Sequence, residues 1–312
     1  MKAVKGTRRN GNKTAQGQKM KRIAIAMKNR LSPRPPQADS LSIKKIPEVK
    51  IFLRTAILGI MLIFWVQRLQ GGILEDVMEG KAAVVDLTYP LNEKNPYWPV
   101  GNYVPFRYEV IANIKKDMVF SGRYSTPEHL GTHIDAPNHF ELNQPSVDQI
   151  PFEQLVGPAV MIDITDKTNL EPDYVLLLSD VEQWEKVHGR IPDRSIILLY
   201  TGWSKRWQNF DDYKNNDTYG CMHFPGYSKE AAVFLVEKRN VKGIGIDTMS
   251  GDCGNCSTFQ VHHVMNRAGK FILENVANLD KLPPRGFTLI VAPIKIEGGS
   301  EGQCRIWALT PK

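Results

Sequence analysis

The 312-residue chain has an ordinary soluble composition, with 42% hydrophobic and 23% charged residues. This length allows one large α/β domain or two smaller domains. The formal net charge of +7 is unevenly placed, because residues 1–54 carry +13 and the remaining 258 residues carry −6. The basic character therefore gives no reason to expect a nucleic-acid partner for the folded part of the chain.

The N-terminal segments differ in composition from the rest of the chain. Residues 1–50 are expected to form a disordered basic tail, because they contain few large apolar side chains. Residues 51–68 form a short apolar segment that is typical of a signal peptide or signal anchor. Its uncharged span of thirteen residues is shorter than the roughly 20 that a membrane-crossing helix needs. We expect entry into the secretory pathway, with membrane or secretory contact through residues 51–66, and a cytoplasmic location as the alternative.

Residues 80–312 contain neither a repeat nor a linker and are predicted to form one domain. Their hydrophobic patterns predict strands at residues 83–87, 106–112, 118–124, 160–164, 195–200, 241–247, 271–273 and 288–293. Helical patterns occur at residues 178–187, 229–239 and 263–268. Strands and helices mix without the strict alternation of a doubly wound sheet. The predicted fold class is therefore α/β with a mixed β core.

One short stretch concentrates side chains that can bind metals. Within eleven residues the chain places His129, His133, Asp135 and His139. Histidines at positions i and i+4 can share one face of a helical turn and hold a metal between them. A glycine and a proline in the stretch prevent the helix from continuing, so Asp135 and His139 are expected to approach from a loop. This density of ligands predicts a metal site.

A metal site of this kind is expected to take further ligands from a distant segment. His262 and Glu274 lie twelve residues apart, around a glycine that would end the short helix between them. His263 competes with His262, and spacing alone does not choose between them. Other polar side chains follow the strand at residues 241–247 and could reach the same cleft or orient ligands: Asp247, Ser250 and Asp252.

Four cysteines permit two disulfides without requiring them: Cys221, Cys253, Cys256 and Cys304. The Cys253-Gly-Asn-Cys256 segment is half of a zinc-ribbon pattern. Because no second half exists, a structural zinc is not expected there.

The pattern HxGTHxDxPxHF at residues 129–140 resembles the signature of the cyclase-family metal hydrolases, which include kynurenine formamidase (arylformamidase). The likeness covers about residues 83–310. It includes weaker pieces in the family's order, at residues 86–91, 201–203, 224–226, 243–247 and 296–299. The resemblance implies a swivelling β/β/α-type fold. The segment with Cys253 and Cys256 departs from the family pattern.

The resemblance also implies which residues hold metal. In the family, the positions of His129, His133 and Asp135 bind one metal, and the aspartate bridges to a second. A histidine and a glutamate twelve residues apart complete the second site, which points to His262 and Glu274 and favours His262 over its neighbour.

The same resemblance implies roles for two further residues. The last histidine of the signature acts as a proton shuttle, which corresponds to His139. A tryptophan of the opening loop lines the substrate pocket, which corresponds to Trp98.

The implied reaction is amide hydrolysis with two divalent metal ions, zinc being expected and manganese being compatible with the same ligands. Zinc lowers the pKa of water to about 7 and so supplies a nucleophile at neutral pH. The expected activity is that of an arylformamidase, which converts N-formylkynurenine to kynurenine and formate in tryptophan catabolism through the kynurenine pathway. The alternatives are hydrolysis of a cyclic amide, as in isatin hydrolases, hydrolysis of another small amide, and an exported non-catalytic metal-binding module. The expected partners are a small aromatic amide and further copies of the chain, in a homodimer or larger homo-oligomer.

Overall fold

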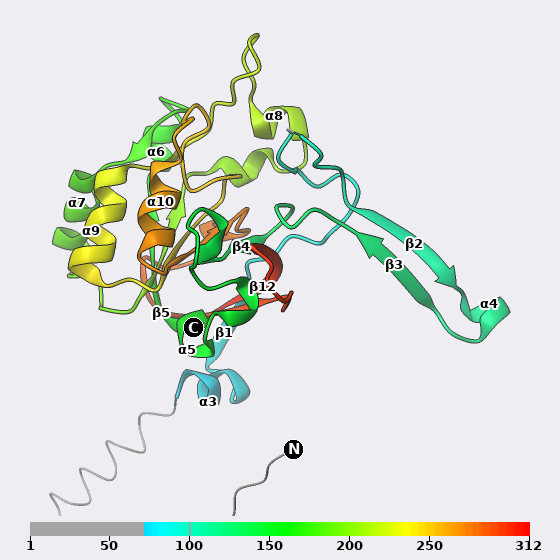
Figure 1. Cartoon of the computed structure of the whole chain (residues 1–312). Coiled ribbons are helices and arrows are strands. Elements are labelled where there is room, and N and C mark those ends of the chain that lie inside the picture. The colour runs from blue at the N-terminus through cyan, green and yellow to red at the C-terminus, as the bar shows by residue number, and fades with distance from the viewer. Residues whose placement is uncertain (1–71, 100) are drawn as a thin grey trace, which may run out of the picture. The chain divides into compact units, whose positions relative to one another are not determined.

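The computed structural model in Figure 1 describes residues 72–99 and 101–312. The predicted basic tail, residues 1–50, and the apolar segment, residues 51–68, lie outside the described residues. The expected secretory location therefore stays a prediction. In the described part of the chain, no helix has both the length and the apolar character that crossing a membrane requires.

The centre of the fold is a mixed eight-stranded sheet in the order β1-β12-β11-β5-β7-β9-β10-β4. Its strands are β1 (Ala82–Asp86), β4 (His133–Asp135), β5 (Val156–Asp163), β7 (Ile196–Tyr200), β9 (Gly243–Ile246), β10 (Phe271–Glu274), β11 (Arg285–Pro293) and β12 (Glu301–Pro311). β5, β7, β9 and β10 run parallel to one another, and the other pairings are antiparallel. Because β4 also pairs with β12, the sheet closes into a barrel-like ring, to which β1 is added.

Helices cover one side of this sheet. α7 (Leu178–His188), α9 (Lys229–Arg239) and α10 (Gln260–Arg267) lie on the same side of the molecule in Figure 1. In β7, Ile197 and Leu199 belong to the core that includes residues of these helices, whereas Ile196 and Leu198 belong to the core on the opposite face. Side chains of a strand alternate between faces, so a strand covered on both faces is apolar throughout. This explains the continuous apolar run of β7.

The remaining elements are short. The described helical segments also include α3 (Ile73–Met78), α4 (Ile114–Asp117), α5 (Phe152–Leu155), α6 (Thr165–Thr168), α8 (Phe210–Lys214), η1 (Pro137–His139), η2 (Val147–Gln149), η3 (Trp203–Arg206) and η4 (Leu279–Lys281). Two small sheets pair β2 (Arg107–Ala112) with β3 (Ser121–Ser125), and β6 (Val175–Leu176) with β8 (Gly226–Tyr227).

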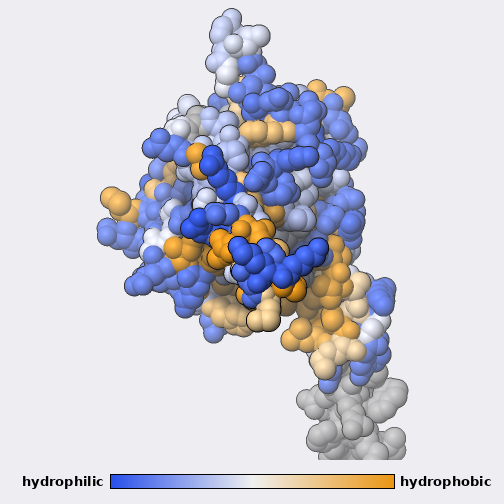
Figure 2. Space-filling model, turned by 90° about the vertical axis from the view of Figure 1, so that its right-hand side faces the viewer, coloured by the Kyte–Doolittle hydropathy of each residue, from blue (hydrophilic) through white to orange (hydrophobic). Residues whose placement is uncertain are grey.

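The segment from β2 through α4 to β3, hereafter the arm, projects from the sheet region (Figure 1). Both of its strands are exposed along most of their length. Figure 2 shows hydrophobic side chains gathered on the side of the molecule that carries the arm. The large exposed hydrophobic residues of the arm are Tyr108, Val110, Ile111, Ile114, Met118, Val119, Phe120 and Tyr124.

The predicted α/β class with a mixed β core is confirmed by the sheet. The helix expected at residues 229–239 matches α9, whereas the helix expected at residues 263–268 begins earlier, at Gln260. His129 and His133 do not share a helical turn, and the interruption expected at the glycine is present. Gly131 has a φ of +67°, a left-handed conformation that turns the chain, and His133 and Asp135 then lie in β4 rather than in a loop.

Shortening a side chain of the core on the face of the sheet opposite the helices tests how much this core contributes to stability. Leu198 is fully buried in β7, so Leu198→Ala should lower the free energy of unfolding by about 2–5 kcal/mol. Leu170→Ala is the matched control, because Leu170 is 87% exposed and should change that free energy by less than about 0.5 kcal/mol. Urea unfolding followed by circular dichroism measures both changes, and equal effects would contradict this assignment of the core.

Candidate metal centre

The register of three strands gathers acidic and histidine side chains on one face of the sheet. β4 pairs with β10 on one side, where Glu274 lies opposite His133. It pairs with β12 on the other side, where Glu301 lies opposite Asp135. Directly opposed residues of antiparallel strands project from the same face, as do residues two apart in one strand. All four side chains therefore converge at β4.

His129 and His133 each direct an unprotonated ring nitrogen toward the carboxylates at β4. His133 donates from Nδ1 to the carbonyl oxygen of Gly131 at 2.9 Å, which leaves Nε2 without a proton in the neutral ring. His129 donates from Nε2 to the carbonyl oxygen of Met249 at 3.2 Å, which leaves Nδ1 bare. His129 Nδ1 and His133 Nε2 lie 3.1 Å apart. His133 Nε2 also lies 3.2 Å from Oδ1 of Asp135.

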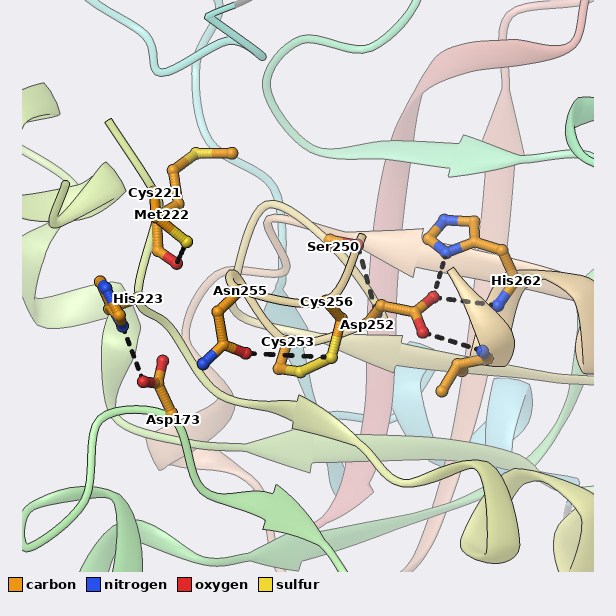
Figure 3. Close-up of a disulfide and its surroundings, with 11 residues drawn as sticks. Asp173, Cys221, Met222, His223, Ser250, Asp252, Cys253, Asn255, Cys256 and His262 are labelled. Carbon is orange, nitrogen blue, oxygen red and sulfur yellow. Dashed lines mark hydrogen bonds and ion pairs between the residues drawn. A yellow bond between two sulfur atoms is a disulfide. The ribbon is translucent and has the colours of Figure 1, made fainter. Parts of the chain in front are cut away.

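His262 joins the cluster from α10. Its Nδ1 donates to Oδ2 of Asp252 at 2.6 Å, a pairing drawn in Figure 3. Its Nε2 therefore faces Oδ2 of Asp135 at 3.2 Å and Oε1 of Glu274 at 3.3 Å. His263 instead contacts Glu141 on the other side of the helix, at 3.0 Å. The structure thus brings His262, rather than His263, to the predicted ligands.

Within this cluster, three buried carboxylate oxygens have no hydrogen-bond partner among the described residues: Oδ1 of Asp135, Oε2 of Glu274 and Oε2 of Glu301. A buried carboxylate is costly unless it is paired or coordinates a metal. Two groups of potential ligand atoms lie within 4.8 Å of one another: His129, His133, Asp135 and Glu301 in one, and Asp135, His139 and His262 in the other. The donor set therefore fits divalent metal ions.

The pKa values of these groups show how strongly the cluster attracts positive charge. Burial alone would lower the pKa of His133, but the neighbouring carboxylates, led by Asp135, raise it to about 9. Burial would raise the pKa of Glu301, but its contacts with His129 and His139 lower it to about 2. Without a metal, the carboxylates thus hold a proton on His133. A divalent cation would replace that proton.

Glu301 is the member of this cluster that the sequence analysis did not identify. Its side chain is only 2% exposed, and its Oε1 lies 2.9 Å from Nδ1 of His139. His139 ends η1, a short helical segment that begins at Pro137. Glu301 has no histidine or aspartate near it in the sequence, so the available signal is its position two residues after the Gly-Gly segment of residues 298–299.

Aromatic side chains form a cavity of about 190 Å³ beside these residues. Trp98 stands edge-on to the ring of His129, with the ring centroids 5.6 Å apart. The lining also includes Tyr103, Phe140, Ser250, Phe259, His139, His262 and Glu301. Trp98 therefore lines this cavity, and its expected contact with a substrate stays a prediction.

The loop after β9 positions Asp252 for its contact with His262. Asp252 also accepts hydrogen bonds from the backbone N–H groups of Val261 and His262, at 2.9 and 3.1 Å. A disulfide between Cys253 and Cys256 follows it directly (Figure 3). Because these contacts fix both the helix start and the imidazole, Asp252 orients the ring of His262.

The other polar side chains of this loop have different partners. Asp247 accepts hydrogen bonds from Thr201 and from the backbone of Ser204, so it stabilises a separate turn. The side chain of Ser250 accepts a hydrogen bond from the backbone N–H of Asp252 at 3.2 Å.

The other two cysteines of the chain, Cys221 and Cys304, are free thiols.

Comparison with known proteins agrees with this geometry. The family model named Cyclase matches residues 85–253, which is more than half of the chain. The chain belongs to the cyclase family.

Individual members of the cyclase family resemble the chain over most of its folded part. An isatin hydrolase from Roseibium aggregatum is 34% identical over 59% of this chain and 73% of that protein. A kynurenine formamidase from Bacillus thuringiensis subsp. konkukian is 30% identical over 68% of this chain and 90% of that protein. The solved structure of isatin hydrolase A from Labrenzia aggregata, bound to benzyl benzoate, superposes with a TM-score of 0.73. It has 35% identity and covers 77% of this chain and 98% of that one.

These relatives confirm the predicted resemblance and the class of enzyme. The protein is a cyclase-family metal-dependent hydrolase, and its relatives act on amide carbon–nitrogen bonds. The ligand positions expected from the family signature meet at a single place in the structure, together with Glu301.

The role of Asp252 can be tested with a matched pair of aspartate–histidine contacts. Asp252→Asn should weaken the orientation of His262 and lower metal affinity by about 10–100-fold, the usual effect of removing such a support. Asp173→Asn is the control, because Asp173 contacts Nδ1 of His223 at 2.7 Å and His223 lies outside both ligand groups. Chelator competition measures both affinities. Unchanged affinity in Asp252→Asn would refute the assigned role.

Proposed function

We propose that the protein hydrolyses an amide attached to an aromatic ring, with a cyclic amide of the isatin kind as the favoured substrate. The observation that carries the proposal is the meeting of the metal-ligand cluster and the aromatic cavity at His129, His139 and His262. Ligand pockets usually measure about 300–1,000 Å³, so a cavity of about 190 Å³ suits a compact, flat substrate. The identity to the Roseibium isatin hydrolase, 34%, also supports this choice.

The second candidate is the arylformamidase reaction on N-formylkynurenine. It is supported by the match to the Bacillus kynurenine formamidase over 90% of that protein. Its substrate carries an amino-acid side chain in addition to the aromatic amide. That side chain would have to extend from the cavity into the neighbouring groove, which shares Tyr103, His139 and Glu301 with it.

The ligand set supports two divalent ions, zinc or manganese. Asp135 directs Oδ1 toward His133 and Oδ2 toward His262, so its carboxylate is placed to serve both ligand groups. Glu274 likewise faces His133 with Oε2 and His262 with Oε1. Divalent ions held here would polarise the amide carbonyl and lower the pKa of water.

The protein's own side chains supply orientation and proton transfer. Trp98, Phe140 and Phe259 enclose the flat ring and exclude water from it. His139 has Nδ1 engaged by Glu301, so Nε2 is the nitrogen left to exchange a proton with the substrate. We assign it the removal of a proton from the attacking water at Nε2 and its return to the leaving nitrogen.

An assay with both substrates tests the function. The metal-loaded protein should open isatin by hydrolysis faster than it cleaves N-formylkynurenine, and the metal-depleted protein should do neither. His139→Ala should lower kcat by about 10²–10⁴-fold, the usual contribution of general acid–base catalysis, with its metal content near that of the wild type. Absorbance assays and metal analysis measure these quantities.

The outcomes separate the alternatives. Faster turnover of N-formylkynurenine would make the protein an arylformamidase instead. Turnover of neither substrate by metal-loaded protein would favour another small amide or the non-catalytic metal-binding module. Loss of metal from His139→Ala would show that His139 is a ligand rather than a proton carrier.

We also propose that the arm mediates assembly with a second copy of the chain, which is the homo-oligomer expected from the sequence. A two-stranded hairpin alone is marginally stable in water, yet Val110, Ile114 and Phe120 of the arm are all at least half exposed. Apolar side chains concentrated on one segment are typical of an interface. A second copy would cover both arms at once through a symmetric contact.

Charged substitutions in the arm test this assembly. The double variant Ile114→Asp/Phe120→Asp should have the mass of one chain in size-exclusion chromatography with light scattering, whereas the wild type should have at least twice that mass. Burying two carboxylates in an apolar contact is strongly unfavourable. Leu170→Asp, at an exposed site outside the arm, should leave the mass unchanged. A monomeric wild type would refute the proposal.

A further inference from the structure

Glu301 stands outside the ligand set that the family signature implies, although its carboxylate lies within the cluster. We propose that Glu301 is a direct ligand of the metal held by His129, His133 and Asp135, through Oε2, and that its Oε1 simultaneously orients His139. This inference rests on the proposed metal-dependent function and assigns one more residue to that site.

The two ring nitrogens of His129 face different carboxylates, and only one of these nitrogens can bind a metal. His129 uses Nε2 to donate to the carbonyl oxygen of Met249, so Nδ1 is the nitrogen available to a metal. Oε2 of Glu301 lies 3.6 Å from this Nδ1. Glu274 instead faces Nε2 of the same ring, also at 3.6 Å. The carboxylate next to Nδ1, the nitrogen of His129 that can bind a metal, is therefore that of Glu301.

The spacing of neighbouring atoms in this group fits ligands that share one metal ion. Ligand atoms that bind zinc tetrahedrally at 2.0–2.1 Å are separated from one another by about 3.3 Å. Neighbouring atoms here are 3.1 Å apart from His129 Nδ1 to His133 Nε2, and 3.2 Å apart from His133 Nε2 to Asp135 Oδ1. The distance from His129 Nδ1 to Glu301 Oε2 is 3.6 Å. The three separations bracket the tetrahedral value.

The state of Oε2 gives independent support. Glu301 is 2% exposed, and Oε2 is buried with no hydrogen-bond partner among the described residues. Its backbone position is fixed by pairing with β4, where it lies opposite Asp135. A carboxylate oxygen that is held in place, deprived of water and directed at Nδ1 of His129 is placed to coordinate a cation.

The other oxygen couples the metal site to proton transfer. Oε1 accepts from Nδ1 of His139 at 2.9 Å, which fixes the ring and leaves Nε2 free. A carboxylate that orients a catalytic histidine in this way sets both its tautomer and its direction. Glu301 thereby holds His139 at a constant place relative to the metal.

Metal binding by Glu301→Ala and Glu301→Gln tests the proposal without reference to substrate. Zinc affinity is measured by chelator competition, and coordination by the visible absorption of the cobalt-substituted protein, which is intense for tetrahedral sites. Both variants should lose more than about 100-fold in affinity at one site, beyond the usual effect of a residue that only supports a ligand, and should change the absorption of the cobalt-substituted protein. Under saturating metal, Glu301→Gln should also lower kcat by about 10²-fold or more, with KM little changed.

Glu141→Gln is the matched control, because Glu141 binds His263 and Arg267 rather than the cluster. It should keep wild-type affinity and absorption. If Glu301→Ala fails to fold, the metal affinity and cobalt absorption of the nearly isosteric Glu301→Gln test the proposal. Wild-type affinity and an unchanged cobalt spectrum in the folded variants would overturn the proposal, and a fall in kcat alone would leave Glu301 as a positioning residue for His139.

The result is distinguishable from failure of the proposed function. If the wild type binds metal and the Glu301 variants lose it, Glu301 is a ligand even when neither aromatic amide is hydrolysed. If the wild type binds no divalent metal, both this inference and the proposed function are wrong.

Discussion

The site depends on the pairing of β4, a strand of three residues, with neighbours on both sides. β10 brings Glu274 beside His133, and β12 brings Glu301 beside Asp135. The two pairings place three carboxylates in an interior that excludes water. Like charges held so closely in a medium of low dielectric constant repel one another, so this register is stable only with positive charge between them. The backbone hydrogen bonds of the sheet hold the acids together, and histidine protons or metal ions provide that charge.

A second constraint acts from the other side of the cluster. His262 is carried by α10, and its direction is set by Asp252 in the loop that follows β9. The same carboxylate receives backbone N–H groups at the start of α10, where the positive end of the helix dipole favours a negative charge. The start of the helix and the ring of His262 are therefore positioned by one side chain, and the disulfide next to Asp252 cross-links the residues that follow it.

The sequence predicts those parts of the site that depend on local spacing. The signature segment identifies His129, His133 and Asp135, and strongly periodic or apolar runs identify α9 and β7. It does not predict β12, because its first residues, Glu301 to Gln303, lack an apolar pattern and are held by pairing with β4, far away in the chain. Glu301 was missed for the same reason. Asp135 was expected in a loop but lies in β4, because pairing with β10 and β12 fixes these residues and local spacing does not reveal such pairing.

The pairing of β12 with β4 also affects the order of folding. Contacts between residues 133–135 and 301–303 join segments separated by most of the domain, and contacts of such long range are slow to form. The same strand holds β1 at its other end. A half-built ring would offer a cation fewer carboxylates, so tight capture of metal waits until β12 docks. With Glu301 as a ligand, loading with metal and completion of the native topology would be a single event in the maturation of the enzyme.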